Sequence, residues 1–172
     1  MLIRLNPSIL FVGIKKSELE KLNSLMDYKL DDVINHRIAM LAIFMKRQIL
    51  KILAENRLEI TPDQWVVLYY LWEENGLSIG EIAKRSEKDF ANVTRIVDKL
   101  VRMEYVTKRK SETDNRISNV FILPKGENIK LDVQNCWKQA SGIALNDVSE
   151  SEQKQLLEIL LKIENNIQRD LA

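Results

Sequence analysis

The chain has 172 residues, of which 45% are hydrophobic and 30% charged, a composition that excludes a disordered protein. No apolar run approaches the roughly 20 residues of a membrane-spanning helix, and the short run ILFVGI lacks the cleavage site of a signal peptide. A single cysteine cannot form an internal disulfide, which fits a reducing cytoplasm. We therefore expect a cytoplasmic protein, and the lack of a long apolar run predicts that it does not contact the membrane.

The net charge of +1 is unevenly distributed along the sequence. Residues 84–116 contain ten basic and six acidic side chains, which gives this segment a charge of +4 and leaves −3 for the rest. A basic segment inside a nearly neutral chain is compatible with binding to nucleic acid, because the local charge matters more than the total.

The N-terminal part of the chain predicts two helices. Residues 17–28, SELEKLNSLMDY, begin with a Ser followed three residues later by Glu20, which is the pattern of a capped short helix. Residues 31–55 carry apolar side chains at three- and four-residue steps, which predicts a long helix. Its apolar stripe is broad, so we expect it to bury more than one side.

Two further helix starts have clear caps. Thr61 precedes Pro62, which favours a helix that begins at the proline and ends before Gly76. In LSIGEIAKRS, Ser78 and Glu81 form a capping box, which predicts a short third helix.

The remaining elements are a helix, a hairpin and two more helices. A fourth helix is expected over 90–103, and two strands over 105–110 and 119–123 are separated by a polar tip. One helix should then run over about 126–145, and another should start at the capping box of Ser149.

This order predicts a mainly α (α+β) fold, a winged helix-turn-helix at residues 59–125 with a two-stranded wing. The flanking segments 31–58 and 126–172 would form a helical dimerisation region, and residues 1–30 an N-terminal extension that supports it. The first and last helices have wider apolar faces than a winged core can cover, so we expect a homodimer.

The fourth helix has an apolar face and a polar face. A solvated surface is the simplest interpretation of the polar face, but a short capped helix precedes it, as in a helix-turn-helix whose second helix enters a major groove. There Arg95 can bond a guanine and Asn92 an adenine. The apolar face is Val93, Ile96, Val97, Leu100 and Val101, and the polar face is Asn92, Arg95, Lys99 and Arg102.

The other DNA-binding candidates surround this helix. Hydroxyl and ammonium groups can bind phosphates, and the N-terminal residues of the helix reach base edges. These candidates are Lys84, Ser86, Lys88, Phe90, Ala91, Thr94 and Lys99.

The hairpin tip, residues 108–118, reads as a wing beside the recognition helix. Arg116 can enter a minor groove, whose negative potential attracts arginine. Asp114, two residues earlier, could brace its guanidinium by a charge-assisted bond. The basic residues expected near phosphates are Lys108, Arg109 and Lys110.

The segment LSIGEIAKRSEKDFANVTRIVDKLVRMEYVTKRKSETDNRISNVFILPKG resembles the winged helix-turn-helix core of the MarR family of bacterial transcriptional regulators. The specific parts are VTRIVDKL and the D-x-R of the wing, followed by a strand, Leu, two residues and Gly. The resemblance covers about 60–126. It implies a homodimer on a double-stranded, pseudo-palindromic DNA operator, with Arg116 in the minor groove and Asp114 supporting it, and a repressor function.

The sequence departs from the family pattern at three positions. Asn115 stands where a second arginine is frequent, and Pro124 where a helix-capping threonine is frequent. Glu104 occupies a turn position that usually holds Gly or Asn, and a left-handed backbone there would cost about 1 kcal/mol.

Many members of the family are released from DNA by a small phenolic or anionic effector or by cysteine oxidation. In this chain Cys136 does not match the family's redox position and is expected to be buried and inert. No cofactor is expected, and no second His or Cys accompanies the single histidine as a metal ligand. Packing within the core is the simpler interpretation of the effector-pocket candidates, which are His36, Arg37, Met40, Trp65 and Tyr69.

Two other classes of function stay open at this point. A winged helix can serve as a protein-interaction module, with its basic face merely solvated. An enzyme is disfavoured, because the sequence has no Gly-rich phosphate loop, no metal-ligand cluster and no nucleophile paired with a histidine.

Overall fold

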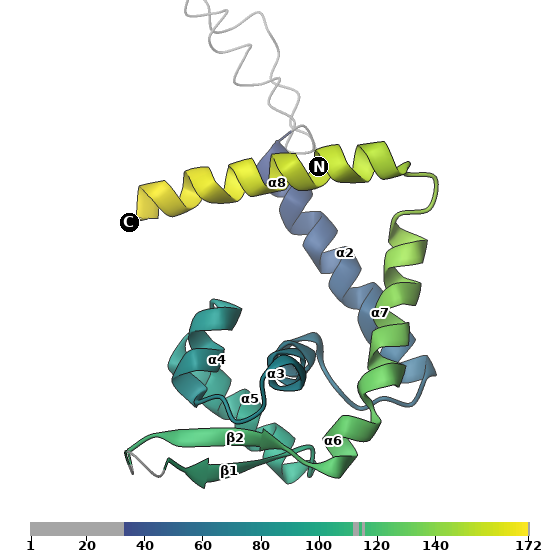
Figure 1. Ribbon diagram of the computed structural model, residues 1–172. Helices are drawn as coiled ribbons and strands as arrows, with labels where there is room; N and C mark the ends of the chain where they lie inside the picture. Colours follow the sequence, from purple (N-terminus) through teal and green to yellow (C-terminus); the bar gives the residue numbers. More distant parts are fainter. Residues whose placement is uncertain (1–32, 112–113, 115, 172) are drawn as a thin grey trace, which may run out of the picture. The chain divides into compact units, whose positions relative to one another are not determined.

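The computed structural model describes residues 33–111, 114 and 116–171, and the helix expected at 17–28 and the extension 1–30 lie outside them. The chain divides into two compact units, residues 1–43 and 44–172. The described part of the first unit is the beginning of one helix, and all later elements belong to the second unit. The elements are α2 (Ile34–Glu55), α3 (Pro62–Glu73), α4 (Ile79–Ser86), α5 (Phe90–Arg102), β1 (Val106–Lys110), β2 (Ser118–Ile122), α6 (Pro124–Asn128), α7 (Lys130–Ala144) and α8 (Glu150–Leu171) (Figure 1).

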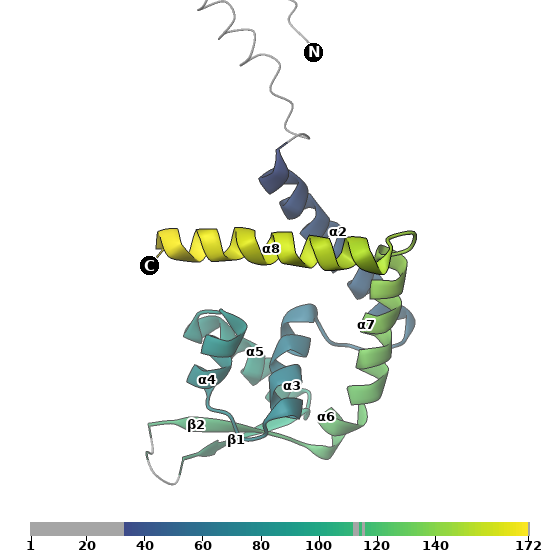
Figure 2. The same ribbon diagram turned by 45° about the horizontal axis from the view of Figure 1, so that its top comes forward.

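The predicted winged helix-turn-helix is confirmed. Helices α3, α4 and α5 pack on one another beside the β1–β2 hairpin, as Figures 1 and 2 both show. Their apolar faces meet in one core, in which each fully buried aliphatic side chain contributes about 1.5–3 kcal/mol. The largest fully buried apolar side chains are Ile49, Leu53, Leu68, Leu71, Ile82, Leu100, Val67, Val93, Val97, Val106 and Val120.

Side-chain caps fix where the helices begin, as predicted. Thr61 accepts a hydrogen bond from the backbone N–H of Gln64 at 3.3 Å, and the Gln64 side chain accepts one from the Thr61 N–H at 2.8 Å. Ser78 and Glu81 form the same reciprocal pair at α4. The bonds from Ser78 hold the pKa of the Glu81 carboxyl below its usual range, so the cap is formed with the charged carboxylate.

The strands pair in antiparallel register from Val106 with Ile122 to Lys110 with Ser118. A turn before α4 covers the other edge of β2, because the backbone N–H of Val120 donates to the Leu77 carbonyl at 2.8 Å and that of Gly76 donates to the Val120 carbonyl at 3.0 Å. Gly76 has φ +90, a conformation that only glycine adopts without strain.

The helix expected over 126–145 is in fact two helices, α6 and α7, which meet at Ile129. The short α6 is held against the backbone at the start of the wing. A Cβ added at Gly126 would lie only 2.3 Å from the carbonyl oxygen of Tyr105. The Gly126 carbonyl also accepts a bond from the Trp72 indole at 3.3 Å, so α6 is fixed from two sides.

Two glutamates adopt the left-handed backbone conformation at turns. Glu104 has φ 61, as expected from its place after the recognition helix. Glu87, between α4 and α5, has φ 51, which the sequence did not predict. A non-glycine residue in this conformation costs about 1 kcal/mol or more, so the surrounding packing must hold both turns.

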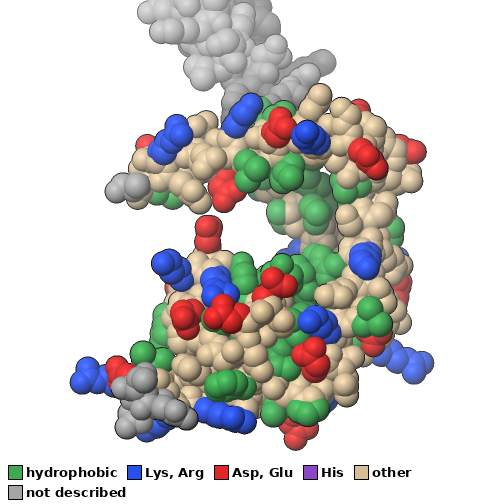
Figure 3. Space-filling view, viewed as in Figure 1, with side chains coloured by type: hydrophobic (Ala, Val, Ile, Leu, Met, Phe, Trp, Pro, Cys, Tyr) green, Lys and Arg blue, Asp and Glu red, His purple; other side chains and the backbone are tan. Residues whose placement is uncertain are grey.

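The last helix leaves its apolar residues in solvent. α8 has no buried residue, and Figure 3 shows hydrophobic side chains at its surface. Among the described residues, no helix is both long and apolar enough to span a membrane. The exposed large hydrophobic residues of α8 are Leu156, Leu157, Ile159, Leu160, Leu161, Ile167 and Leu171.

Candidate nucleic-acid interface

The turn between α4 and α5 is built by backbone and cap bonds. Glu87 reverses the chain in the left-handed conformation, and the backbone N–H of Lys88 donates to the Ala83 carbonyl at 3.1 Å. Asp89 then caps α5, its carboxylate accepting from the Asn92 backbone N–H at 2.7 Å. These contacts set the angle at which α5 leaves α4.

Lys88 has a partner that the sequence did not predict. Its ammonium lies 2.8 Å from one carboxylate oxygen of Asp63, and Lys46 lies 3.7 Å from the other. The hydrogen bond from Lys88 is the main reason that the pKa of Asp63 is lowered. The Lys88 side chain is only 23% exposed, so this lysine, expected at a phosphate, instead ties the turn to the start of α3.

The two faces of α5 are separated as predicted. Val93, Val97 and Leu100 are completely buried, whereas Arg95 and Lys99 on the other face are exposed. Asn92, Arg95 and Lys99 line a shallow groove together with the first turn of α3. The outer face of α5 therefore presents a row of cationic and amide groups that a ligand can contact.

The two predicted phosphate-binding hydroxyls donate within their own helices. The Thr94 hydroxyl donates to the Phe90 carbonyl at 2.8 Å, and the Ser86 hydroxyl donates to the Ile82 carbonyl at 2.7 Å. Each hydroxyl has one hydrogen, so in this arrangement neither is free to donate to a phosphate. Of the other candidates, Lys84 and Ala91 are exposed on α4 and α5.

An ion pair joins the wing to α5. Lys108 on β1 lies 2.6 Å from the Asp98 carboxylate on α5. The Arg109 guanidinium lies 4.9 Å from the centre of the Phe121 ring. Lys110, at the end of β1, is exposed, and Figure 3 shows Lys and Arg side chains around this end of the molecule.

The Asp114 carboxylate organises the turn of the wing. It accepts a hydrogen bond from the Arg116 backbone N–H at 2.9 Å, and the Asp114 carbonyl accepts one from the Ile117 N–H at 2.9 Å. Among the contacts of the described residues, the predicted bond to the Arg116 guanidinium does not occur. A short carboxylate reaches the backbone two residues ahead more readily than the end of a long side chain, so Asp114 positions Arg116 through its main chain.

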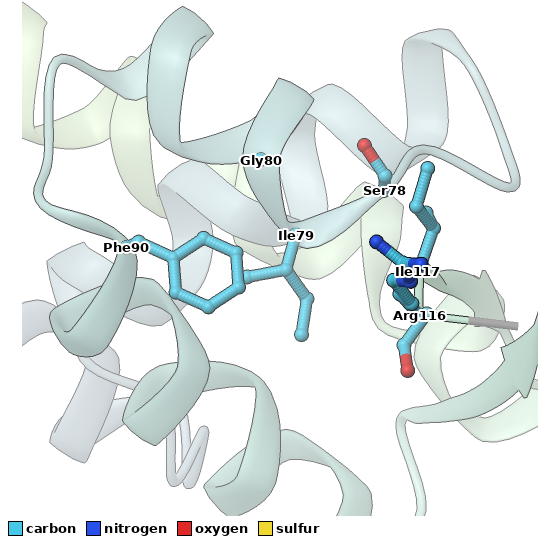
Figure 4. Close-up of a pocket in the computed structure, with 7 residues that line it drawn as sticks. Ser78, Ile79, Gly80, Phe90, Arg116 and Ile117 are labelled. Atoms are coloured by element: carbon cyan, nitrogen blue, oxygen red, sulfur yellow. The ribbon is translucent and has the colours of Figure 1, made fainter. Parts of the chain in front are cut away.

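A pocket of about 250 Å³ lies between α4, the first residue of α5 and the wing. Figure 4 shows the Phe90 ring on the α5 side and the exposed Arg116 beside Ile117 on the wing side. Ile79 and Gly80 of α4 complete its wall. The recognition helix and the wing thus share one concave surface.

A second hollow, of about 460 Å³, is lined by aromatic residues of α3 and α7. The rings of Trp65 and Trp137 are 4.1 Å apart, and Tyr69 lies 5.7 Å from Trp65. Both indole N–H groups are buried, and neither has an acceptor within the described structure. Lys138 lies at the same hollow.

The sequence predicts Trp65 and Tyr69 at a pocket, but it does not predict the α7 side of this hollow. The signal was present, because Gln134, Trp137, Lys138 and Ser141 recur at three- and four-residue steps and therefore share a helix face. The other predicted pocket residues, His36, Arg37 and Met40, belong to the first unit of the chain, so their role there stays a prediction.

Cys136 is buried, as expected, with 3% of its surface exposed. Burial is the main cause that raises the pKa of its thiol, and the nearby Asp132 carboxylate adds to it. A protonated, buried thiol is a poor nucleophile. Within the described part of the chain, no group of His, Cys, Asp and Glu side chains is arranged to hold a metal ion.

Comparison with known proteins agrees with this geometry. Residues 60–118, from the start of α3 through the wing, match the model of the MarR family. This segment, about a third of the chain, is therefore similar to the winged helix-turn-helix domain of the MarR family. Family members and relatives are transcriptional regulators and not enzymes, in agreement with the sequence-based prediction.

One curated relative is the uncharacterized HTH-type transcriptional regulator YsmB of Bacillus subtilis, 32% identical over 74 residues. The match covers 43% of this chain and about half, 51%, of YsmB.

Solved structures of other proteins share the fold at low identity. The PcaV regulator of Streptomyces coelicolor, solved with its natural ligand, has a TM-score of 0.74 at 19% identity, and the match covers 80% of this chain and 96% of PcaV. Reduced AbfR, solved bound to DNA, has a TM-score of 0.68 at 16% identity over 92% of this chain and 100% of AbfR.

Proposed function

We propose that the chain is a sequence-specific regulator of transcription that binds double-stranded DNA, with α5 in the major groove and the wing at the minor groove. The observation that carries the proposal is the exposed face of α5, where Arg95 and Lys99 stand opposite a fully buried stripe. On the wing, Arg116 lines one pocket with Phe90, the first residue of α5. AbfR, a protein of the same fold, has been solved on DNA, which supports the proposal by analogy.

Titration of a fluorescent duplex from the region upstream of the chain's gene tests this function. Binding should weaken steeply with salt, because each neutralised phosphate releases counterions. About six phosphate contacts would give a slope near −5 in a plot of log K against log salt concentration. Binding without salt dependence, or none at all, would favour the alternative of a protein-interaction winged helix.

Arg116→Ala should weaken binding by about 1 kcal/mol or more and lower the preference for duplexes with an A-tract beside the half-site, where the minor groove is narrow. Lys110→Ala is the matched control on the same wing. It should weaken binding to all duplexes alike, because phosphate contacts carry no sequence information. Equal A-tract preference in wild type and Arg116→Ala would contradict insertion of the wing.

We further propose that the regulator acts as a homodimer on a pseudo-palindromic operator. The exposed apolar residues of α8, including Leu157 at 58%, form a surface that a soluble protein normally covers. Sedimentation should show a dimer at micromolar concentration, and Leu157→Glu should shift it toward monomer without loss of helical circular dichroism. A wild-type monomer at that concentration would contradict the proposal.

Release from DNA by a small anionic phenol would make the protein a repressor under effector control. The hollow at Trp65 and Trp137 supports this, because two buried N–H donors without acceptors are each unfavourable by about 1–3 kcal/mol, and a ligand that entered between the rings could supply an acceptor. Lys138 could pair with a carboxylate or phenolate, and the indole rings could pack on an aromatic ring.

A hydroxybenzoate titration checks the pocket. The ligand should quench tryptophan fluorescence and release bound duplex over the same concentration range. Trp137→Phe keeps an aromatic ring but removes one donor, and it should weaken the ligand about tenfold. Unchanged affinity in this variant would place the ligand elsewhere.

A further inference from the structure

Phe90 is a large apolar side chain in an unusual place. It is the first residue of α5, directly after the cap Asp89, and 61% of its surface is exposed. Its spacing from Val93 and Val97 would place it on the buried stripe of the helix, yet those two valines are completely buried. The core covers α5 from Val93 onward and does not extend one turn further, to the ring of Phe90.

The surroundings of Phe90 are apolar on one side and open on the other. Ile79, which is 6% exposed, and Ile117 of the wing line the same pocket, and Figure 4 shows the ring extending from the start of α5 toward Ile79. Among the ring–ring contacts of the described residues, none involves Phe90. The ring therefore has apolar neighbours on one side, and its other side is exposed and can contact a ligand.

The N-terminal residues of a recognition helix are those that approach base edges. The apolar group that the major groove displays is the C5-methyl of thymine, and a phenyl ring is among the side chains that contact it. The neighbouring candidates Asn92 and Arg95 are polar and suit adenine and guanine, so they leave that methyl group to another residue.

We propose that Phe90 determines specificity by contacting the C5-methyl group of a thymine in each half of the operator. This proposal rests on the proposed DNA-binding function and names the chemical group that the start of α5 selects. The ring would exclude water from the methyl group, so the contact favours thymine over uracil at that position, although both present the same hydrogen-bonding groups.

Replacement of thymine by deoxyuridine tests this contact one methyl group at a time. A tight-binding duplex is first selected from random-sequence DNA with the full-length chain, and each thymine is then replaced in turn. Anisotropy titrations compare wild type with Phe90→Ala and Phe90→Leu. Because Phe90 is mostly exposed, both variants should fold, and circular dichroism checks this.

We expect one thymine per half-site at which removal of the methyl group weakens wild-type binding about fourfold. Phe90→Ala should bind the unmodified duplex more weakly and should no longer distinguish thymine from uracil there, while Phe90→Leu should keep part of the difference.

Three results would overturn the proposal. One is a wild type that is insensitive to every replacement, and another is a Phe90→Ala variant that is as sensitive as wild type. A third is uniform weakening of all sequences by Phe90→Ala, which would mean that the ring covers the sugar–phosphate backbone. If no duplex binds in a salt-sensitive way, the proposed function itself fails, and that outcome is distinct from these three.

Discussion

Replacing Gly126 with alanine should lower the free energy of unfolding by about 3 kcal/mol, at the upper end of the usual range for overpacking. The added Cβ would lie 2.3 Å from the Tyr105 carbonyl oxygen and 3.1 Å from its carbon. These are backbone atoms at the start of the wing, so the clash cannot be relieved by turning a side chain. Either α6 or β1 must move, and a shift of α6 would weaken the bond from Trp72 to the carbonyl of residue 126.

Gly142→Ala is a matched control in the same part of the chain. Gly142 lies in α7, and an added Cβ there meets nothing within 4 Å. Alanine is the better helix former, so this variant should be more stable by up to about 1 kcal/mol. Urea unfolding followed by circular dichroism gives both values. If Gly126→Ala were as stable as wild type, α6 would not be fixed against the wing as described.

The second large effect is expected at Arg95. Arg95→Ala should weaken binding to the preferred duplex by about 1–3 kcal/mol and relax the choice of base at one position in each half-site. The reason is that an exposed arginine on the recognition helix can donate two hydrogen bonds to one guanine. Titrations against duplexes with each of the four bases at that position measure the change.

Arg95→Lys separates base recognition from charge. Lysine keeps the positive charge but cannot reproduce the planar fork of the guanidinium. If Arg95 reads a base, Arg95→Lys should lose most of the base preference while it keeps more affinity than Arg95→Ala. If both variants keep the wild-type base preference, Arg95 contacts only phosphate.

The sequence predicted the helices and strands because their signals are local. Thr61 and Ser78 cap their helices with partners three residues away, and such patterns can be read without knowledge of the fold. The buried stripe of α5 follows from helical spacing for the same reason. The exposed Arg95 was therefore predictable as a candidate for binding.

Features that depend on distant parts of the chain were not predictable. The break between α6 and α7 accompanies the contact of Gly126 with Tyr105, about twenty positions earlier in the sequence. Lys88 pairs with Asp63 on another helix, and Lys108 with Asp98. The sequence predicted both lysines near phosphates, but their carboxylate partners are determined by tertiary packing.

The contacts of the candidate site were only partly predictable, because they also depend on tertiary packing. Asp114 was predicted beside Arg116, and it is, but its carboxylate bonds the backbone and not the guanidinium. Trp137 was not foreseen as a partner of Trp65, because nothing in either helix reveals which face of the other it meets.

The ion pairs around the recognition helix have a consequence for how the protein would search a genome. Arg85, Lys88 and Lys108 are each paired with a carboxylate, so fewer cations attract DNA than the basic segment contains. Non-specific affinity depends almost entirely on such cations, whereas specific affinity also includes base contacts. Partial neutralisation would therefore lower the affinity for all sequences by a similar factor and leave base contacts with a larger share of the free energy of operator binding.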